Sequence, residues 1–310
     1  METNKMDIYQ QLLRELSEIE GDPEILLDEP MSRHTTFRIG GPADVFVSPR
    51  DEKQTAEVLG AVRRSGLPFF ILGNGSNLLV SDSGFRGVVI RIYRNMSDIN
   101  VNGEEICAGA GALLSAIAAA ARSAELTGFE FASGIPGTLG GAVVMNAGAY
   151  GGEMKDVLAC ARVLTPQGEI KTLALPELKL GYRTSIIKEE DLVVLSAVMR
   201  FEKGDAAAIR DKMQDLQQRR VTKQPLEFPS AGSTFKRPEG YFAGKLIEDA
   251  GLRGFAVGGA KVSDKHCGFV INADHATADD VMRLIQQVKG RVYESSGVRL
   301  EPEVRFLGDF

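Results

Sequence analysis

Apolar residues recur along this chain with two periods, and the period changes many times within its 310 residues. Spacings of three and four residues, typical of amphipathic helices, occupy 51–66, 113–126, 205–225 and 276–297. Period-two alternation and short apolar runs, typical of strands, occupy 67–72, 86–93, 104–110, 156–175 and 191–204. Because helices and strands interleave without an internal repeat, the pattern predicts an α+β fold.

Local signals refine several of these elements. In the helix 51–66 we expect Ala56, Leu59 and Val62 to face the core. The segment 156–175 is predicted to form two strands joined by a turn at Pro166-Gln167-Gly168. The last helix is expected to begin at an N-cap, Thr277, with Asp280 three residues further on.

We expect the chain to divide into four parts. An amphipathic polar helix opens the segment 1–30, and the character of the sequence changes near residue 94 and more clearly after Gly204. The predicted parts that follow are 31–93, 94–204 and 205–310. A closing strand is predicted over 298–308, and it could pack back on the earlier part of the chain.

Composition narrows the class of protein. Hydrophobic residues make up 44% and charged residues 25%, as in ordinary globular proteins, and no apolar run approaches the ~20 residues of a membrane span. The formal net charge of −6 argues against nonspecific nucleic-acid binding. The opening residues have neither the apolar core nor the cleavage site of a signal peptide, so we expect a cytoplasmic location.

The cysteines and histidines are few and scattered. Three cysteines far apart in the sequence predict no disulfide framework, which fits a reducing compartment. Cys107 and Cys160 lie in apolar, strand-like runs, so we expect both to be small core residues. With three histidines and neither a CxxC nor a HExxH spacing, we expect no metal site.

Two glycine-rich stretches are the strongest candidates for chemistry. Seven glycines fall within 134–152, and no charged residue lies between Glu130 and Glu153. A second stretch, 73–77, follows directly on the predicted strand 67–72. Glycine lets backbone amides approach and surround the phosphates of a nucleotide, so the two stretches could hold the two ends of one dinucleotide.

Tight turns between packed strands are the alternative interpretation of both stretches. The common nucleotide-binding signatures do not settle the choice. The stretch 73–78 lacks the third glycine of GxGxxG, and no GxxxxGK[ST] occurs anywhere in the chain. A dinucleotide site here would therefore be of a non-Rossmann kind.

Three short polar stretches supply candidate catalytic groups. Arg183, within 181–185, offers a planar, permanent positive charge for a carboxylate or an enolate oxygen. Ser233, within 229–238, lies in no GxSxG elbow, so it is a better candidate for a proton donor than for an acylating nucleophile. In a closing strand, Glu301 and Glu303 would share one face. A surface arginine, a turn hydroxyl and a solvated edge strand are the plainer alternatives.

Three ordered motifs resemble a known flavoprotein family. HTTFRIGGPADVFV, LGNGSNLLV and SGIPGTLGGAVVMNAGAYG are similar to the FAD-binding half of the vanillyl-alcohol-oxidase-like flavoproteins. More narrowly, the chain from His34 to Phe306 resembles the UDP-N-acetylenolpyruvoylglucosamine reductases of the short, type II form. The resemblance implies a two-subdomain, PCMH-type FAD-binding fold followed by a C-terminal α+β substrate-binding domain. It also implies non-covalent FAD. The cofactor-lining residues that it implies are Gly73, Asn74, Gly75, Ser76, Asn77, Leu78, Gly134, Pro136, Gly137, Thr138, Gly140, Gly141, Ala142, Asn146, Gly148 and Ala149.

The same resemblance implies a reaction. NADPH supplies hydride through the flavin to UDP-N-acetylglucosamine enolpyruvate, a step of peptidoglycan precursor synthesis. Arg183 stabilises the enolate, Ser233 gives a proton to C2 and Glu303 assists, while Lys223, Tyr182 and Lys236 bind substrate. Residues 186–230 leave no room for the tyrosine-bearing loop that some relatives insert, and Arg237 stands where some relatives have asparagine.

Two other functions remain open from the sequence. The same cofactor scaffold serves flavin oxidases and dehydrogenases, which act on other hydroxy acids or alcohols and need a base for C–H oxidation. A non-catalytic nucleotide-binding module is the second alternative.

Overall fold

The computed structural model describes residues 2–310, with side chains described from Met6 onward, and the chain forms two compact units. Unit 1 comprises the chain up to Leu27, Val45–Gly73 and Gly87–Gln217. Unit 2 comprises Asp28–Asp44, Asn74–Arg86 and Gln218–Phe310. Each unit is therefore built from three separate stretches of sequence. The predicted division at residues 30, 93 and 204 is finer than this partition and stays a prediction.

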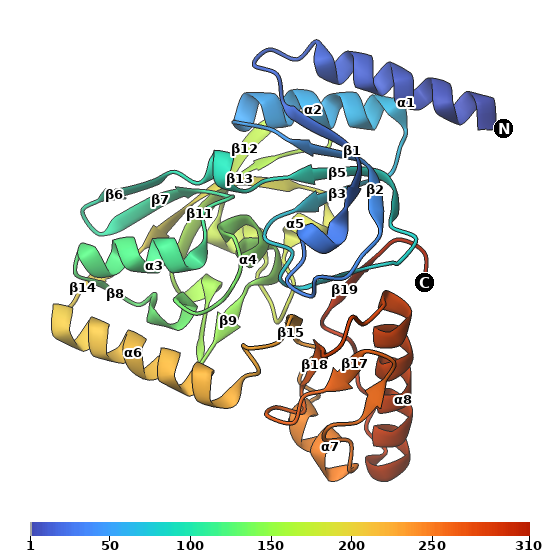
Figure 1. Ribbon diagram of the computed structural model, residues 1–310. Helices are drawn as coiled ribbons and strands as arrows, with labels where there is room; N and C mark the ends of the chain where they lie inside the picture. Colours follow the sequence, from blue (N-terminus) through green and yellow to red (C-terminus); the bar gives the residue numbers. More distant parts are fainter. Residues whose placement is uncertain (1) are drawn as a thin grey trace. The chain divides into compact units, whose positions relative to one another are not determined.

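Unit 1 is organised around an antiparallel sheet in the order β12-β11-β13-β7-β6 (Figure 1). Its strands are β6 (Ile99–Asn102), β7 (Glu105–Gly109), β11 (Leu158–Leu164), β12 (Ile170–Ala174) and β13 (Val193–Arg200). The helices of this unit are α1 (Glu2–Ser17), α2 (Glu52–Ser65), α3 (Leu114–Ser123), α4 (Leu139–Met145) and α5 (Ile186–Glu189). Two-residue strands complete it: β8 (Leu126–Thr127), β9 (Gly148–Ala149), β10 (Gly152–Glu153) and β14 (Glu202–Lys203).

A second sheet has the order β1-β2-β5-β3. It comprises β1 (Glu24–Pro30), β2 (Pro42–Ser48), β3 (Phe69–Leu72) and β5 (Phe85–Arg91). Strands β3 and β5 pair in parallel, with Leu72 opposite Arg91, so the first glycine stretch leaves the sheet at the end of β3. The core of unit 1 gathers the apolar faces of both sheets and of α2, α3 and α4, including Val58, Ile90 and Ile117.

Unit 2 carries the antiparallel sheet β15-β18-β17-β16 beside the helices α7 and α8 (Figure 1). The bounds are β15 (Ser230–Ser233), β16 (Ala256–Val257), β17 (Ala260–Val262), β18 (Phe269–Asn272), α7 (Ala243–Asp249) and α8 (Ala278–Ser296). The closing strand β19 (Arg305–Leu307) pairs in parallel with β4 (Leu78–Val80). The core of this unit includes Phe37, Ile39 and Leu79 from its two earlier stretches of chain. Helix α6 (Ala206–Lys223) passes from one unit into the other.

Most predicted elements are confirmed. Helix α2 begins after the N-cap Asp51, and Leu59 and Val62 are fully buried while Ala56 is half-buried. The predicted turn at Pro166-Gln167-Gly168 joins β11 to β12. Thr277 caps α8 through its side chain, and its backbone N–H donates to Asp280, which completes the expected capping box.

Two structural expectations are wrong. The closing strand extends only over Arg305–Leu307, so Glu301 and Glu303 lie in irregular chain and share no strand face. Cys107 is exposed and Cys160 is half-buried, because both side chains lie on the outward face of the five-stranded sheet, on either side of Val198. Their apolar neighbours in sequence point to the opposite, buried face. No helix among residues 2–310 is both long and apolar enough to cross a membrane.

Candidate active site

The glycine-rich stretch 134–152 folds into a short helix followed by a hairpin. Helix α4 ends at Met145, and its C-cap Asn146 has a φ of 41°, in the left-handed region. Strands β9 and β10 then pair, with Glu153 opposite Gly148. Tyr150 and Gly151, at the tip, have φ values of 55° and 91°. Positive φ at both central residues is the mark of a type I′ turn, whose twist matches that of a hairpin.

Close packing explains part of the glycine content. A Cβ at Gly152 would come within 2.6 Å of the Phe131 ring, and one at Gly148 would come within 2.6 Å of the Gly152 carbonyl oxygen. The turn interpretation that the sequence left open therefore holds for the C-terminal half of this stretch.

Gly141 has no such structural cause. It is an exposed helical residue, and the nearest atom to a Cβ built there is Thr138 Oγ1, at 3.6 Å. Alanine would fit this position and would favour the helix by about 0.5–1 kcal/mol. Glycine at this position lowers the stability of the helix but leaves its backbone uncovered. An uncovered backbone in a stretch without charged side chains suits the close approach of a ligand's phosphate groups.

The end of β3 meets the same stretch. A Cβ at Gly73 would lie 2.3 Å from Thr138 Oγ1, so the first glycine stretch begins directly against the residue that precedes α4. Of the predicted cofactor-lining residues, unit 1 thus brings Gly73 together with Thr138 and the following helix. Asn74 to Leu78 belong to unit 2. The exposed backbone at Gly141 and the contact at Gly73 together fit the cradle of a dinucleotide such as FAD.

Arg183 lies in a tight turn rather than on an open surface. Gly181 and Thr184 form an isolated antiparallel bridge, and Arg183 between them has a φ of 57°. Its side chain is half-buried, donates to the carbonyl of Gly148 at 3.4 Å, and lies 5.1 Å from the centre of the Tyr182 ring. This turn therefore places a guanidinium beside the hairpin of the glycine-rich stretch.

In unit 2 a β-bulge sets the direction of Ser233. Ser230 and Ser233 on β15 face Ile271 and Phe269 on β18, so three steps on one strand match two on the other. Gly232, within the extra step, has a φ of 74°. Bulges re-aim side chains at the ends of pairing. The exposed hydroxyl of Ser233 is thereby displaced from the regular alternation of β15.

Glu303 runs beside the same segment. Its backbone N–H donates to the carbonyl of Thr234 at 2.8 Å, and its own carbonyl accepts from the Asn77 side chain at 3.2 Å. Unit 2 thus brings together Asn77, Ser233 and Glu303, three of the predicted site residues. The carboxylate of Glu301 instead forms an ion pair with Lys236 at 3.1 Å.

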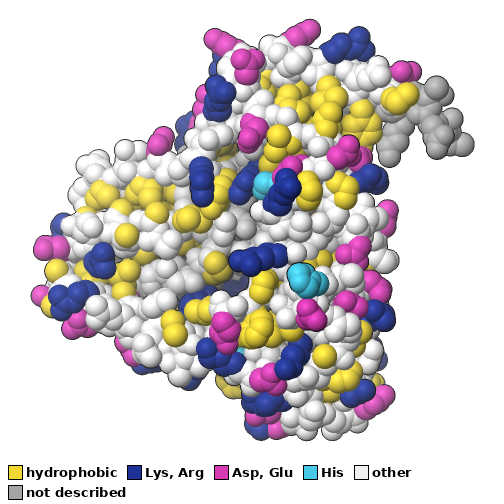
Figure 2. Space-filling view, viewed as in Figure 1, with side chains coloured by type: hydrophobic (Ala, Val, Ile, Leu, Met, Phe, Trp, Pro, Cys, Tyr) yellow, Lys and Arg dark blue, Asp and Glu magenta, His cyan; other side chains and the backbone are white. Residues whose placement is uncertain are grey.

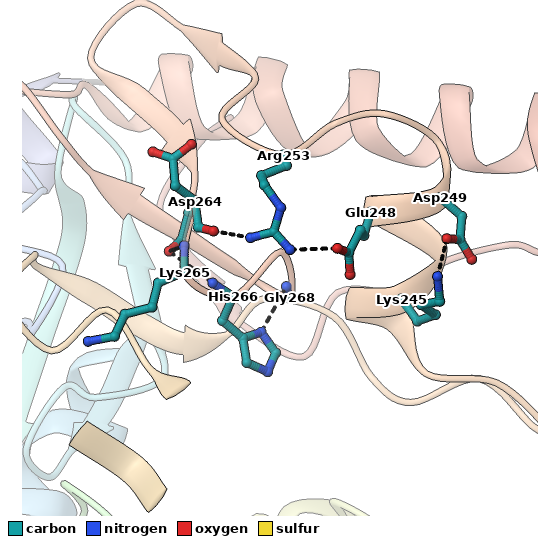
Figure 3. A network of polar contacts seen from close by, with 9 residues as sticks. Lys245, Glu248, Asp249, Arg253, Asp264, Lys265, His266 and Gly268 are labelled. Atoms are coloured by element: carbon teal, nitrogen blue, oxygen red, sulfur yellow. Dashed lines mark hydrogen bonds and ion pairs between the residues drawn. The ribbon is translucent and has the colours of Figure 1, made fainter. Parts of the chain in front are cut away.

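A turn at 263–268 takes part in a network of polar contacts in unit 2 (Figure 3). Arg253 joins Glu248 at 2.7 Å and also donates to the carbonyl of Asp264, while the Gly268 N–H donates to His266 Nδ1 at 3.0 Å. Burial lowers the pKa of His266, and the charges of Arg253 and Lys223 lower it further. The ring is therefore neutral near pH 7.

Neither the distribution of surface charge seen in Figure 2 nor the placement of possible metal ligands marks a further site among the described residues. Basic and acidic side chains are interspersed on the face seen in Figure 2. Among residues 2–310, no group of three or more His, Cys, Asp or Glu side chains is placed to hold a metal ion.

Comparison with known proteins decides the family. A sequence model of the FAD binding domain matches residues 43–174, and one of the UDP-N-acetylenolpyruvoylglucosamine reductase C-terminal domain matches residues 224–307. The chain is 51% identical over 306 residues to the UDP-N-acetylenolpyruvoylglucosamine reductase of Clostridioides difficile strain 630, covering 99% of each chain. It is 55% identical over 298 residues to that of Agathobacter rectalis, covering 92% of this chain and 95% of the relative. The chain belongs to the UDP-N-acetylenolpyruvoylglucosamine reductase family.

A solved structure agrees with this family assignment. The UDP-N-acetylenolpyruvylglucosamine reductase (MurB) of Thermus caldophilus is 34% identical, with a TM-score of 0.79, over 92% of this chain and 99% of that one. As a member of the reductase family with a FAD binding domain, the protein is a flavin-dependent oxidoreductase. The PCMH-type FAD-binding fold with a C-terminal α+β domain is confirmed.

Sequence reasoning did not single out two residues that contact the predicted site segments in the structure. Arg305 follows Glu303 by two positions, and burial lowers the pKa of its guanidinium. The Arg305 N–H also donates to the Asn77 carbonyl at 3.1 Å. Ser185 is fully buried and donates to the Val144 carbonyl at 2.8 Å, which ties the Arg183 turn to α4. A half-buried charge and a buried hydroxyl cannot be recognised from spacing alone.

Proposed function

We propose that this protein reduces the enolpyruvyl group of UDP-N-acetylglucosamine enolpyruvate to give UDP-N-acetylmuramate, with NADPH as the reductant. The observation that carries the proposal is the 51% identity, over 99% of both chains, to a UDP-N-acetylenolpyruvoylglucosamine reductase. The step belongs to peptidoglycan precursor synthesis, and so to cell-wall biogenesis, cell shape and division. The three free cysteines support a reducing, cytoplasmic location.

Gly73, Thr138 and the bare backbone around Gly141 would hold FAD, which when bound would supply the hydride transfer from NADPH to the vinyl carbon C3 of the substrate. Asn146 is fully buried and its amide is bonded within unit 1, so it is set apart from the cofactor. The other predicted cofactor-lining residues of both glycine stretches are proposed to surround FAD.

Arg183 is proposed to bind the substrate carboxylate. Hydride arrival at C3 leaves negative charge at C2, which spreads into the carboxylate as an enolate. The guanidinium is fixed by its turn and by its bond to Gly148, so it meets this charge without reorganising. Preorganised donors of this kind each contribute about 3–4 kcal/mol to catalysis.

Ser233 is proposed to deliver the proton that C2 requires, and Glu303 to assist it. A serine hydroxyl is a weak acid, so it needs a strongly basic carbon and a partner that replaces its proton. The main chain of Glu303 is bonded to Thr234, the residue that follows Ser233, which supports their acting together. Lys223, Tyr182 and Lys236 are proposed to bind the sugar nucleotide.

The test separates the two half-reactions. In Ser233→Ala, NADPH should bleach the visible flavin band at the wild-type rate, because the hydroxyl serves only the second step. Recolouring by the enolpyruvyl sugar nucleotide should slow by about 100-fold or more. Ser230→Ala, on the same strand, is the matched control and should match wild type in both steps. Equal slowing of both half-reactions in Ser233→Ala would remove the proton-donor role.

A further inference from the structure

We propose that Asn146 is a positioning residue that fixes Arg183 for the second half-reaction. The proposal rests on the proposed function, because it needs Arg183 to act on the substrate. Asn146 is fully buried and stands at the C-terminus of α4, in the middle of the glycine-rich stretch.

Every hydrogen-bonding group of the Asn146 amide is used by the protein. The Nδ2 group donates to Glu153 Oε2 at 2.6 Å and to the Gly181 carbonyl at 3.1 Å. The Oδ1 atom accepts from the Lys155 N–H at 2.9 Å. This side chain thus makes two hydrogen bonds as a donor and one as an acceptor within unit 1, and these bonds connect separate segments of the chain.

The segments that it joins are the two sides of the Arg183 environment. Gly181 opens the turn that carries Arg183, and Glu153 lies opposite Gly148, the residue whose carbonyl accepts from Arg183. Asn146 therefore fixes the turn that holds the guanidinium and the hairpin that receives its hydrogen bond. Ser185 adds a second tie from the same turn to α4.

The backbone of Asn146 selects the residue type. Its φ of 41° and ψ of 56° are left-handed, a conformation that asparagine and glycine adopt at low cost. Serine would lack the reach to these three partners, and glutamine would adopt the left-handed conformation less readily. Asn146→Gly therefore removes the three side-chain bonds without straining the end of α4, and Asn146→Asp removes only the donors.

The pattern of kinetic losses identifies the role. Asn146→Gly should keep flavin bleaching by NADPH within about twofold of wild type, while transfer to the enolpyruvyl substrate falls by about 10- to 100-fold. Hydrogen exchange at the amides of 181–185 should accelerate. Equal loss in both half-reactions, or unchanged exchange, would overturn the positioning role.

A double-mutant cycle with Arg183→Ala separates this inference from the proposed function. If Asn146 acts only through Arg183, then adding Asn146→Gly to Arg183→Ala should slow the second half-reaction no further. Additive losses would overturn the inference and leave the role of Arg183 intact. Full turnover by Arg183→Ala alone would instead overturn the role of Arg183.

Asn146→Asp supplies an independent test through pH. The introduced carboxylate faces the carboxylate of Glu153 and the Gly181 carbonyl, and it can donate only when protonated. The second half-reaction of this variant should recover relative to wild type as pH falls. A ratio of variant to wild-type rate that does not change with pH would contradict the proposal.

Discussion

At the scale of single residues, the most informative position is Gly141. It is exposed and helical, and a Cβ built there would make an ordinary van der Waals contact with Thr138 and no clash, so packing does not require a glycine at this position. Gly141→Ala should therefore stabilise the flavin-free protein by about 0.5–1 kcal/mol, measured by urea denaturation. The added methyl group should weaken FAD binding by about tenfold or more, measured by fluorescence titration.

Gly290→Ala is the matched control. Gly290 lies inside α8, with no atom within 4 Å of a built Cβ. It should give the same gain in stability and leave FAD affinity unchanged. If Gly141→Ala binds FAD as tightly as wild type, the backbone of α4 does not contact the cofactor.

Residue types were predictable where a local rule dictates them. The Thr277 and Asp280 pair follows from helix capping, which involves only neighbours in sequence. Cys107 was mistaken for a core residue because its apolar neighbours lie on the other face of the strand. The role of Asn146 depends on Gly181, 35 positions away, and no local pattern contains that contact.

At the scale of elements, the turn 263–268 makes a pH-dependent contribution to stability. Burial, followed by the charges of Arg253 and Lys223, lowers the pKa of His266 in the folded protein below its ordinary value of 6.5. Above pH 6.5 both folded and unfolded chains hold a neutral ring. As pH falls below 6.5 the unfolded chain takes up the proton first, so the free energy of unfolding decreases.

His266→Asn tests this contribution. Asparagine places an acceptor near the position of Nδ1 for the Gly268 N–H and carries no titrating ring. Between pH 7.5 and 5.5 the urea midpoint of wild type should fall more than that of the variant. Identical falls would mean that His266 is protonated as readily in the folded chain as in the unfolded one.

Elements were predicted well where their periodicity runs over many residues, as in α2 and α8. The stretch 298–308 misled because charged and apolar residues alternate there, although before Arg305 the chain makes only an isolated bridge from Pro302 to Phe235 and no continuous strand. What orders 301–304 is main-chain bonding to Thr234 and Lys236, far away in sequence. The bulge that directs Ser233 is likewise a property of two paired strands, and one strand's sequence does not contain it.

At the scale of the whole molecule, the discontinuity of the two units was the part least accessible to sequence. The change of character after Gly204 suggested a self-contained C-terminal part. Yet unit 2 takes Asp28–Asp44 and Asn74–Arg86 from the N-terminal half of the chain. Those stretches carry buried Phe37 and Leu79, and Leu79 lies in β4, the partner of β19.

A fragment of residues 205–310 should therefore fail to fold cooperatively. It lacks the strand that pairs with β19 and the side chains of Phe37, Ile39 and Leu79 from its core. Removing one buried phenylalanine side chain already costs about 3–5 kcal/mol, against a total stability of about 5–15 kcal/mol for a domain. Circular dichroism should show a broad, non-cooperative thermal transition for this fragment. A fusion that joins residues 28–44 and 74–86 to 218–310 through flexible linkers should restore a cooperative one. A sharp, reversible transition in 205–310 alone would show that the two earlier stretches are dispensable for this core.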